Sequence, residues 1–348
     1  MNNVRIAGIG TAVPPHVVHQ HQVRSIIEQL LGRHELSLAH VLRVFEHEHV
    51  RTRRFVMPPE WYAEDHSFAY RNSVYSEQAV LLATEAAQKA LDRSSAQVEA
   101  IVVASTTGIM TPSLDAALMQ TLHLRSTCKR LPVFGLGCAA GVSGLARAAE
   151  VCAALNGHPV LFVAVEVCST TFQKNDFSKS NIVGSSIFGD GAAAVLLSWN
   201  GTGPVVHNSY STLFPSTEDI MGWDVSDDGL KVRFSRDIPA FVRENIPSIL
   251  TNACAEWGID LQNIADVIAH PGGSKVLDAY AAALGRTPPA FSIARSVLQE
   301  FGNMSSASVL FVLERWLQSQ QRTKRSGYSL MAALGPGFSA EQVLLFQP

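Results

Sequence analysis

Two stretches of this chain repeat the same order of predicted elements at the same spacing, and this repeat constrains the fold more than any other feature. A β-branched run ends at Ser105, and a helix begins 33 residues later at Cys138. A second run ends at His270, and a helix begins 33 residues later at Asn303. Because internal repeats decide architecture, a duplicated domain with a pseudo-twofold axis would bring Cys138 and Asn303 face to face. Coincidence between two ordinary α/β segments is the alternative.

Short β-branched runs alternate with Ala- and Leu-rich segments, which predicts a parallel or mixed sheet covered by helices and hence the α/β class. The predicted strands are 4–10, 100–105, 131–134, 159–166, 192–198, 205–210, 266–270, 330–334 and 342–346. The predicted helices are 76–91, 114–122, 138–154, 238–257, 274–284 and 305–317. A Gly- and Pro-containing seam at 199–204 predicts one domain over 1–200 and a second over 201–348.

Charge and cysteine content narrow the function classes. A net charge of −3 gives no general field for nucleic acid or an anionic membrane. Five cysteines without a C-x-x-C pair fit neither a disulfide framework nor a zinc ribbon. The N-terminus lacks the apolar run of a signal peptide, and no stretch approaches the roughly 18 consecutive apolar residues of a membrane helix. We therefore expect a cytoplasmic protein.

Cys138 has the setting of a displayed nucleophile, because it follows a strand, lies in a glycine-rich turn and begins a helix. Gly137 and Gly141 permit a tight turn and close packing, and a helix N-terminus favours the thiolate. On local sequence alone, a cysteine in apolar surroundings is also a common inert core residue. Both interpretations stay open at this point.

His270 and Asn303 are candidate partners for this nucleophile. His270 ends a predicted strand, which is where α/β proteins place sites, and a cysteine nucleophile needs a base. Asn303 begins a helix, where its simplest role is that of an N-cap. Opposite Cys138, however, it would join His270 in donating two neutral hydrogen bonds to a developing oxyanion. The three residues suit acyl transfer onto sulfur followed by attack of a carbanion.

Two further clusters invite a ligand. Arg51, Arg53 and Arg54 form the only compact basic cluster, which suits a phosphorylated carrier such as coenzyme A or is simply a solvated face. Seven histidines lie before residue 50 but form no metal-binding motif, so we expect them to be surface residues that bind no metal. These are His16, His19, His21, His34, His40, His47 and His49.

Taken together, the motifs resemble those of the type III polyketide synthases, the chalcone synthase superfamily within the thiolase fold. The resemblance covers essentially the whole chain and is carried by the motifs Gly137-Cys-Ala-Ala-Gly141, Phe188-Gly-Asp-Gly-Ala-Ala-Ala194, His270-Pro-Gly-Gly273, Gly302-Asn-Met-Ser-Ser306 and Gly335-Pro-Gly337. It implies duplicated βαβαβαββ halves in a layered αβαβα architecture, and a homodimer. It also implies acyl-CoA and malonyl-CoA as substrates, without a metal or redox cofactor.

The resemblance implies a role for each site residue. Cys138 would take the starter acyl group, while His270 and Asn303 would promote decarboxylation of malonyl-CoA to the attacking enolate. Phe188 matches the aromatic gate between the CoA tunnel and the cavity in which the chain grows. The further residues implied for the substrate cavity are Cys168, Thr171, Gly222, Val232, Thr111 and Ser305, and those for coenzyme A are Arg51, Arg53, Arg54 and Gly273.

Within the family, the segments 53–62, 173–180, 221–225 and 234–239 resemble bacterial synthases that make alkylresorcinols or alkylpyrones from long fatty acyl-CoAs. Val232 stands where plant relatives carry a bulky aromatic, which suggests room for a longer starter. Ala333-Leu334 departs from the Gly-Phe of many relatives. Aldol closure to a resorcinol and lactonisation to a pyrone both stay open. The rivals are a 3-oxoacyl-carrier-protein synthase III-like enzyme, whose histidine motif differs, and a non-catalytic partner subunit.

Overall fold

The computed structural model describes residues 3–31, 41–47, 49–92, 97–323 and 325–348. Its centre is a nine-stranded sheet with the order β11-β12-β13-β8-β1-β7-β6-β4-β5. The strands are β1 (Arg5–Ala12), β4 (Ala100–Ala104), β5 (Lys129–Val133), β6 (Val160–Val167), β7 (Asp190–Ser198), β8 (Val205–Leu213), β11 (Ile264–Ala269), β12 (Gly327–Gly335) and β13 (Ser339–Gln347). The α/β class is therefore confirmed.

The two halves of the sheet have the same topology. In the N-terminal half, β1, β7 and β6 are antiparallel neighbours, and β4 pairs parallel with β6. In the C-terminal half, β8, β13 and β12 are antiparallel neighbours, and β11 pairs parallel with β12. The halves meet where Arg5 of β1 pairs with Val205 of β8. The duplicated architecture that the 33-residue spacing predicts is confirmed, whereas the domain division at residue 200 stays a prediction.

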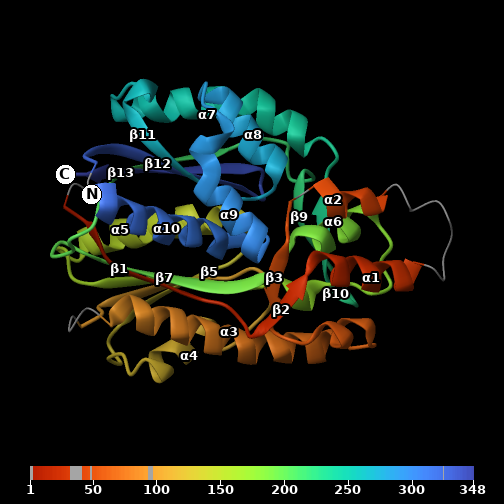
Figure 1. Ribbon diagram of the computed structural model, residues 1–348. Helices are drawn as coiled ribbons and strands as arrows, with labels where there is room; N and C mark the ends of the chain where they lie inside the picture. The colour runs from red at the N-terminus through yellow and green to blue at the C-terminus, as the bar shows by residue number, and fades with distance from the viewer. Residues whose placement is uncertain (1–2, 32–40, 48, 93–96, 324) are drawn as a thin grey trace.

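Helices and sheet halves form five layers, as Figure 1 shows. The outer layers are α3 (Phe68–Leu91) with α4 (Leu114–Thr121), and α7 (Ile238–Trp257) with α8 (Ser274–Ala283). Between the sheet halves lie α5 (Ala140–Ala154) and α10 (Ser308–Thr323). Because helices cover both faces, β4, β6 and β7 are buried along their whole length. This arrangement matches the expected αβαβα order.

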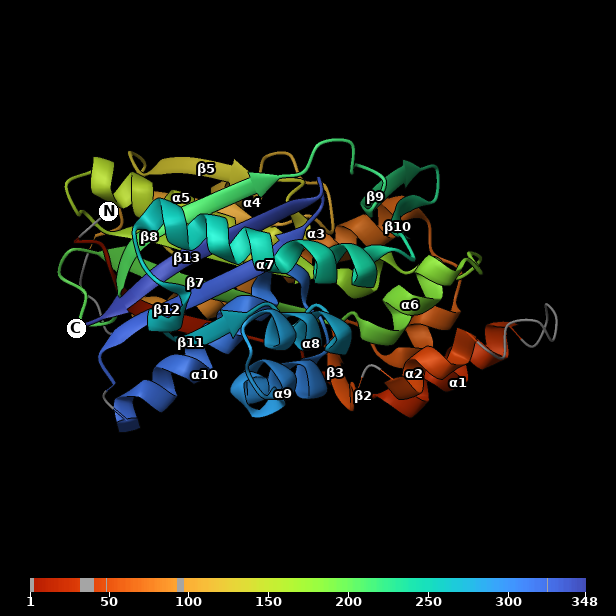
Figure 2. The ribbon, with the colours of Figure 1, turned by 90° about the horizontal axis from the view of Figure 1, so that it is seen from above.

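A smaller group of elements lies at one end of these layers (Figure 2). It comprises α1 (Gln20–Leu31), α2 (Val44–His47), α6 (Lys179–Ile187), the pair β2 (His16–His19) with β3 (Thr52–Phe55), and the hairpin β9 (Met221–Ser226) with β10 (Gly229–Phe234). The helix α9 (Ser292–Phe301) packs near this end. The sequence analysis predicts none of these elements.

Local signals explain two differences from the predicted boundaries. Helix α3 begins at Phe68 rather than Ser76, because Ser67 caps it by accepting a hydrogen bond from the Tyr70 amide at 3.2 Å. Cys138 itself lies in the short 3₁₀ turn η4 (Gly137–Ala139) that precedes α5.

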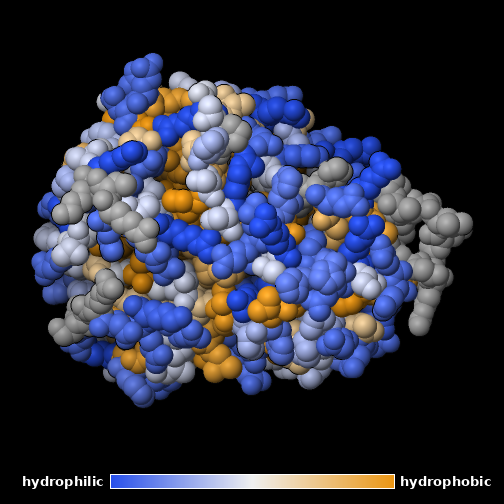
Figure 3. Space-filling model, in the orientation of Figure 1, coloured by the Kyte–Doolittle hydropathy of each residue, from blue (hydrophilic) through white to orange (hydrophobic). Residues whose placement is uncertain are grey.

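None of the described helices is long and apolar enough to cross a membrane. The face in Figure 3 is mainly hydrophilic, with apolar side chains in small groups.

Candidate active site

Cys138, His270 and Asn303 converge on one cavity of about 640 Å³. Cys138 follows β5, His270 follows β11, and Asn303 follows α9, so the duplicated topology delivers them from three separate parts of the chain. The Nδ2 atom of Asn303 lies 3.9 Å from Cys138 Sγ. The structure therefore brings together the three residues that the sequence singles out.

Two glycines permit this convergence. A Cβ atom at Gly141 would lie 2.2 Å from the carbonyl oxygen of Ser306, so only glycine lets the start of α5 approach the start of α10 this closely. At Gly335, a Cβ atom would lie 2.7 Å from the carbonyl oxygen of Leu136. Both contacts lie beside η4 and hold the turn of Cys138 against the C-terminal half.

The amide of Asn303 has a fixed orientation. Its Oδ1 accepts a hydrogen bond from the Ser305 amide at 2.8 Å, and its Nδ2 donates to the Gly272 carbonyl at 3.4 Å. Nδ2 and Oδ1 then lie 3.9 and 4.0 Å from Cys138 Sγ. The backbone of Asn303 forms an isolated bridge with Phe188, donating to the Ile187 carbonyl at 2.7 Å and accepting from the Gly189 amide at 3.0 Å. Two backbone hydrogen bonds thus hold together the segments that carry the Asn303 amide and the Phe188 ring.

His270 is buried, and its imidazole is uncharged at neutral pH. Its backbone amide donates to the Ala332 carbonyl at 2.8 Å, which fixes the residue at the end of β11. Neither ring nitrogen has a hydrogen-bond partner among the described residues. Burial lowers the pKa of His270 to about 3. One ring nitrogen can therefore accept a proton while the other, in the neutral ring, donates a hydrogen bond.

The thiol of Cys138 is protonated in the resting site. Burial raises its pKa to about 11, the hydrogen bond with Ser305 at 3.6 Å opposes this, and the charge of Glu166 adds to it. A helix N-terminus is worth only about 0.3–1 kcal/mol to an anion. The helix N-terminus and the backbone hydrogen bond at Cys138 favour the thiolate, but loss of solvation is the larger effect.

Glu166 lies buried behind Cys138 and is held by three donors. It accepts hydrogen bonds from the Thr106 amide and Thr107 Oγ1, each at 2.9 Å, and from Ser306 Oγ at 2.7 Å. Burial raises the pKa of Glu166 to about 6, and these hydrogen bonds limit the rise. Near neutral pH the carboxylate opposes formation of a second negative charge at Cys138.

Phe188 forms an aromatic cluster with the hairpin. Its ring centroid lies 6.0 Å from that of Trp223 and 5.8 Å from that of Phe234. It also lines an apolar slot of about 50 Å³. The slot is lined further by the predicted residues Cys168, Thr171 and Val232 and by Val23 and Ile27 of α1.

Some predicted cavity residues lie elsewhere. Gly222 lines neither the main cavity nor the apolar slot, because the strand alternation turns it to the outer face of the hairpin, against Arg233. Thr111 is exposed and likewise lines neither of these two cavities. Ser305 contacts Cys138, and Gly273 lines the main cavity. Ala333 and Leu334 also line it.

The predicted arginine cluster is not a cluster. Arg53 is fully buried and donates to the carbonyls of Ser185 at 2.7 Å, Ser186 at 2.8 Å and Phe188 at 3.1 Å. Arg54 is half-buried because side chains alternate along β3, and Arg51, which precedes the strand, is exposed. Arg53 therefore cannot meet a solvated phosphate, and Arg51 and Arg54 are not among the residues that line the main cavity.

A different group of basic side chains borders the main cavity, and the sequence does not predict this group. We call it the basic rim; it consists of the exposed side chains of Arg43, Lys179, Arg236 and Lys275. These residues come from four separate segments, so no local run of charge could reveal them. Only the fold places them around one opening.

The early histidines do not gather into a site. Across the residues that the structure describes, no group of three His, Cys, Asp or Glu side chains could hold a metal. His19, His21 and His49 are exposed, and His16 is half-buried. His34, His40 and the side chain of His47 lie outside the described residues.

Known proteins match this fold and site along the whole chain. The family model for the N-terminal domain of chalcone and stilbene synthases matches residues 2–204, and the model for their C-terminal domain matches residues 205–347. The chain belongs to the chalcone and stilbene synthase family. It is accordingly a type III polyketide synthase, an acyltransferase that catalyses decarboxylative condensation.

Individual relatives of this synthase cover nearly all of it. A putative chalcone synthase of Bacillus subtilis is 39% identical, over 97% of both chains. A 1,3,6,8-tetrahydroxynaphthalene synthase of Streptomyces peucetius is 37% identical, over 98% of this chain and 92% of its own. The crystal structure of the Streptomyces coelicolor 1,3,6,8-tetrahydroxynaphthalene synthase, a bacterial type III polyketide synthase, superposes with a TM-score of 0.92 at 31% identity, over 99% of both chains.

Proposed function

We propose that this synthase condenses a fatty acyl-CoA starter with malonyl-CoA units and cyclises the product to an alkylpyrone or alkylresorcinol. The observation that carries the proposal is the convergence of Cys138, His270 and Asn303 on one cavity. Cys138 is the nucleophile, and the other two residues stabilise the oxyanion and enolate. Substrates are coenzyme A thioesters, and no metal or redox cofactor takes part.

In the first step the starter moves to Cys138. Since the resting thiol has a pKa of about 11, His270 accepts its proton as Sγ attacks the thioester carbonyl. The bond between the acyl carbon and the coenzyme A sulfur breaks. Coenzyme A leaves as the thiol, with the proton returned by His270, and the acyl group remains on Cys138.

In the second step malonyl-CoA is decarboxylated. Loss of CO₂ leaves an enolate whose oxygen accepts hydrogen bonds from Asn303 Nδ2 and from the neutral ring of His270. Each such donor typically stabilises the transition state by about 3 kcal/mol. The enolate carbon attacks the acyl carbonyl, and the bond to Cys138 Sγ breaks with its electron pair on sulfur. The thiolate takes up a proton from solvent to restore the resting thiol, and a chain two carbons longer leaves on coenzyme A.

The basic rim is our candidate site for the phosphates of coenzyme A. Arg43, Lys179, Arg236 and Lys275 border the cavity that holds Cys138. Arginine and lysine bind phosphate through charge-assisted hydrogen bonds. The lining residue Gly273 leaves room for the pantetheine arm between this rim and His270.

The apolar slot supports a starter with a hydrocarbon chain. Val23, Ile27 and Val232 present aliphatic side chains to it, beside Phe188. Each methylene group buried there would contribute about 0.8 kcal/mol to binding. The 1,3,6,8-tetrahydroxynaphthalene synthases among the relatives favour a second candidate, formation of 1,3,6,8-tetrahydroxynaphthalene.

Mass spectrometry of products from malonyl-CoA, with and without acyl-CoA starters of rising length, tests these proposals. We expect pyrones or resorcinols that carry the starter chain, with long starters preferred. Formation of tetrahydroxynaphthalene from malonyl-CoA alone, with no incorporation of longer starters, would favour the second candidate. Turnover of malonyl groups only from a carrier protein would instead support the carrier-protein rival.

We also propose a homodimer formed through the edge of the sheet at β5. Beside this edge strand, Phe134 is 62% exposed and Ile109 is 48% exposed. An unpaired strand edge flanked by apolar side chains is a template for pairing with a second chain. Thr111 lies two residues from Ile109, so a partner on this face would cover it.

A further inference from the structure

The β9–β10 hairpin is a wall shared by the cavities around the gate. Its inner face presents Met221 and Phe234 to the main cavity and Val232 to the apolar slot. Trp223, which pairs with Val232 across the hairpin, contacts the ring of Phe188. Any displacement of this hairpin changes the width of the slot and the packing of the gate together.

The hairpin forms its own two-stranded sheet, so its position depends on side-chain contacts. At its base, Ser180 of α6 exchanges hydrogen bonds with the backbone of Phe234 at 3.2 and 3.3 Å. At its turn, Gly229 packs on the ring of Phe68, where an added Cβ atom would lie 2.6 Å from that ring. The turn is otherwise held by a polar network that reaches it from two other elements.

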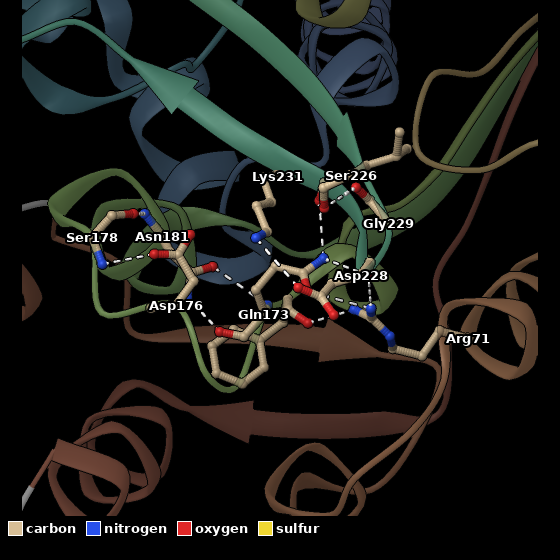
Figure 4. Close-up of polar contacts among 11 residues, drawn as sticks. Arg71, Gln173, Asp176, Ser178, Asn181, Ser226, Asp228, Gly229 and Lys231 are labelled. Atoms are coloured by element: carbon tan, nitrogen blue, oxygen red, sulfur yellow. Dashed lines mark hydrogen bonds and ion pairs between the residues drawn. The ribbon is translucent and has the colours of Figure 1, made fainter.

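Arg71 and Gln173 converge on this turn, as Figure 4 shows. Arg71 of α3 is 8% exposed; its Nη1 donates to the carbonyls of Phe172 at 2.7 Å and Thr170 at 3.3 Å, and its Nη2 donates to the carbonyl of Asp228. Gln173, 6% exposed, donates through Nε2 to the carbonyls of Asp228 and Leu230, both at 3.2 Å.

On the hairpin the acceptors of this network are backbone carbonyls, so it holds the path of the hairpin rather than one side chain. Arg71 Nη2 also donates to Gln173 Oε1 at 3.4 Å, which joins the two side chains. Gln173 is itself held, since its carbonyl accepts from Asn181 Nδ2 at 2.7 Å. By contrast, the ion pair of Lys231 with the carboxylate of Asp228, at 3.3 Å, joins two solvent-accessible side chains within the hairpin. That pair cannot tie the hairpin to the body of the molecule.

We propose that Arg71 and Gln173 are positioning residues that latch the β9–β10 hairpin over the gate and thereby limit the length of acyl chain that the synthase accepts. The latched slot measures about 50 Å³, and Val232 on the hairpin forms one of its walls. Release of the latch lets Val232 withdraw and widens the slot. The specificity part of this inference rests on the proposed function; the mechanical part does not.

Two measurements on the same variants test the latch. Hydrogen exchange of the amides in 221–234, followed by mass spectrometry without substrate, reports whether the hairpin is held. In Arg71→Ala we expect exchange there to be on the order of tenfold faster, because hydrogen bonds from a charged, buried donor are lost. Intact-protein mass spectrometry of Cys138 acylation, with acyl-CoAs competing in pairs, reports chain length. We expect the preference to shift toward the longer chain by about tenfold.

The control is Lys231→Ala, which removes a charge from the same hairpin but leaves the latch and should alter neither measurement. Arg71→Lys keeps the charge without the fork and should give intermediate values. Where Arg71→Ala fails to fold, Gln173→Leu removes two latch hydrogen bonds and is expected to act in the same direction. Unchanged exchange in the latch variants would overturn the inference, and so would faster exchange with an unchanged chain-length preference. Absence of acylation of the wild-type enzyme would refute the proposed function, while the exchange measurement would still decide the mechanical part.

Discussion

Cys138 and His270 line the same cavity as two neutral groups, since burial raises the pKa of the thiol to about 11 and lowers that of the imidazole to about 3. A thiolate–imidazolium pair is therefore not the resting state. The proton moves only when a thioester arrives, which limits reaction of the free enzyme with other electrophiles. Glu166, with a pKa of about 6, is the nearby group that titrates close to physiological pH.

Alkylation of Cys138 by iodoacetamide should report this electrostatic balance. Reactivity rises with pH as the thiolate forms, up to the pKa of about 11. Glu166→Gln removes a negative charge, lowers the pKa of Cys138 and speeds alkylation at pH 8 to 9. Ser305→Ala removes a hydrogen bond that favours the thiolate, so it raises the pKa and slows alkylation.

Peptide-level mass spectrometry distinguishes Cys138 from Cys128, Cys152, Cys168 and Cys254, all of which are buried. Below pH 6 Glu166 is protonated in the wild type, so its replacement should matter less there. Shifts of the two variants in the same direction would contradict this account of the site.

Asn303→Ala should slow decarboxylation of malonyl-CoA by about 10²–10³-fold, because one of two donors to the enolate oxygen is lost. Release of ¹⁴CO₂ from labelled malonyl-CoA measures this step directly. Acylation of Cys138 by acyl-CoA alone should persist in the variant. Equal loss of both activities would mean that Asn303 supports the fold of the site rather than the enolate.

At the scale of elements, Arg53 does not have the predicted ligand role but stabilises the end of a helix. Predicted as a ligand for phosphate, it instead caps the C-terminus of α6 and fixes the backbone of Phe188. Burial lowers its pKa to about 9, and the nearby charge of Asp190 offsets part of this. A short basic run in sequence does not reveal which of its members points inward.

Arg53→Met should reduce the free energy of unfolding by about 3 kcal/mol, because the carbonyls at the end of α6 and the Asp190 carboxylate lose their buried partner. Urea unfolding followed by circular dichroism provides the measurement. Arg54→Met, at the next position of β3 and on the opposite face of the strand, is the matched control and should change stability by less than about 0.5 kcal/mol. Similar losses in both would argue against the capping role.

The sequence predicts long, buried elements better than short, half-exposed ones. Strands such as β6 and β7 are continuous apolar runs, whereas α6 owes its place to Ser178, which caps it by accepting from the Asn181 amide at 3.2 Å. The β9–β10 hairpin did leave a signal. Asp228-Gly229 lies between two runs that alternate apolar and polar residues, a pattern typical of a tight hairpin.

At the scale of the whole molecule, the equal spacing was the most informative feature of the sequence. It predicts both the two matched halves of the sheet and the meeting of Cys138 with Asn303. The basic rim and the Arg71–Gln173 latch could not be predicted in this way, because their members are distant in sequence and acquire a common role only in the folded chain.

Phe134→Glu should convert the proposed dimer to a monomer, because it places a charge on an apolar face beside the β5 edge. Size-exclusion chromatography with light scattering measures the mass, which is 37.6 kDa for one chain. Leu213→Glu is the control, since Leu213 is 70% exposed and lies in β8, away from the β5 edge. A monomeric wild type, or dimers in both variants, would contradict the proposed interface.

The bridge between Phe188 and Asn303 has a consequence for how such an enzyme can diversify. The backbone around Phe188 is hydrogen-bonded to the backbone of Asn303. Exchange of side chains around the ring can therefore alter which substrates enter while the reaction itself is preserved. A change that shifts the backbone of Phe188 would also displace the amide of Asn303. New specificities should therefore arise by exchange of the side chains around Phe188 and not by displacement of its backbone.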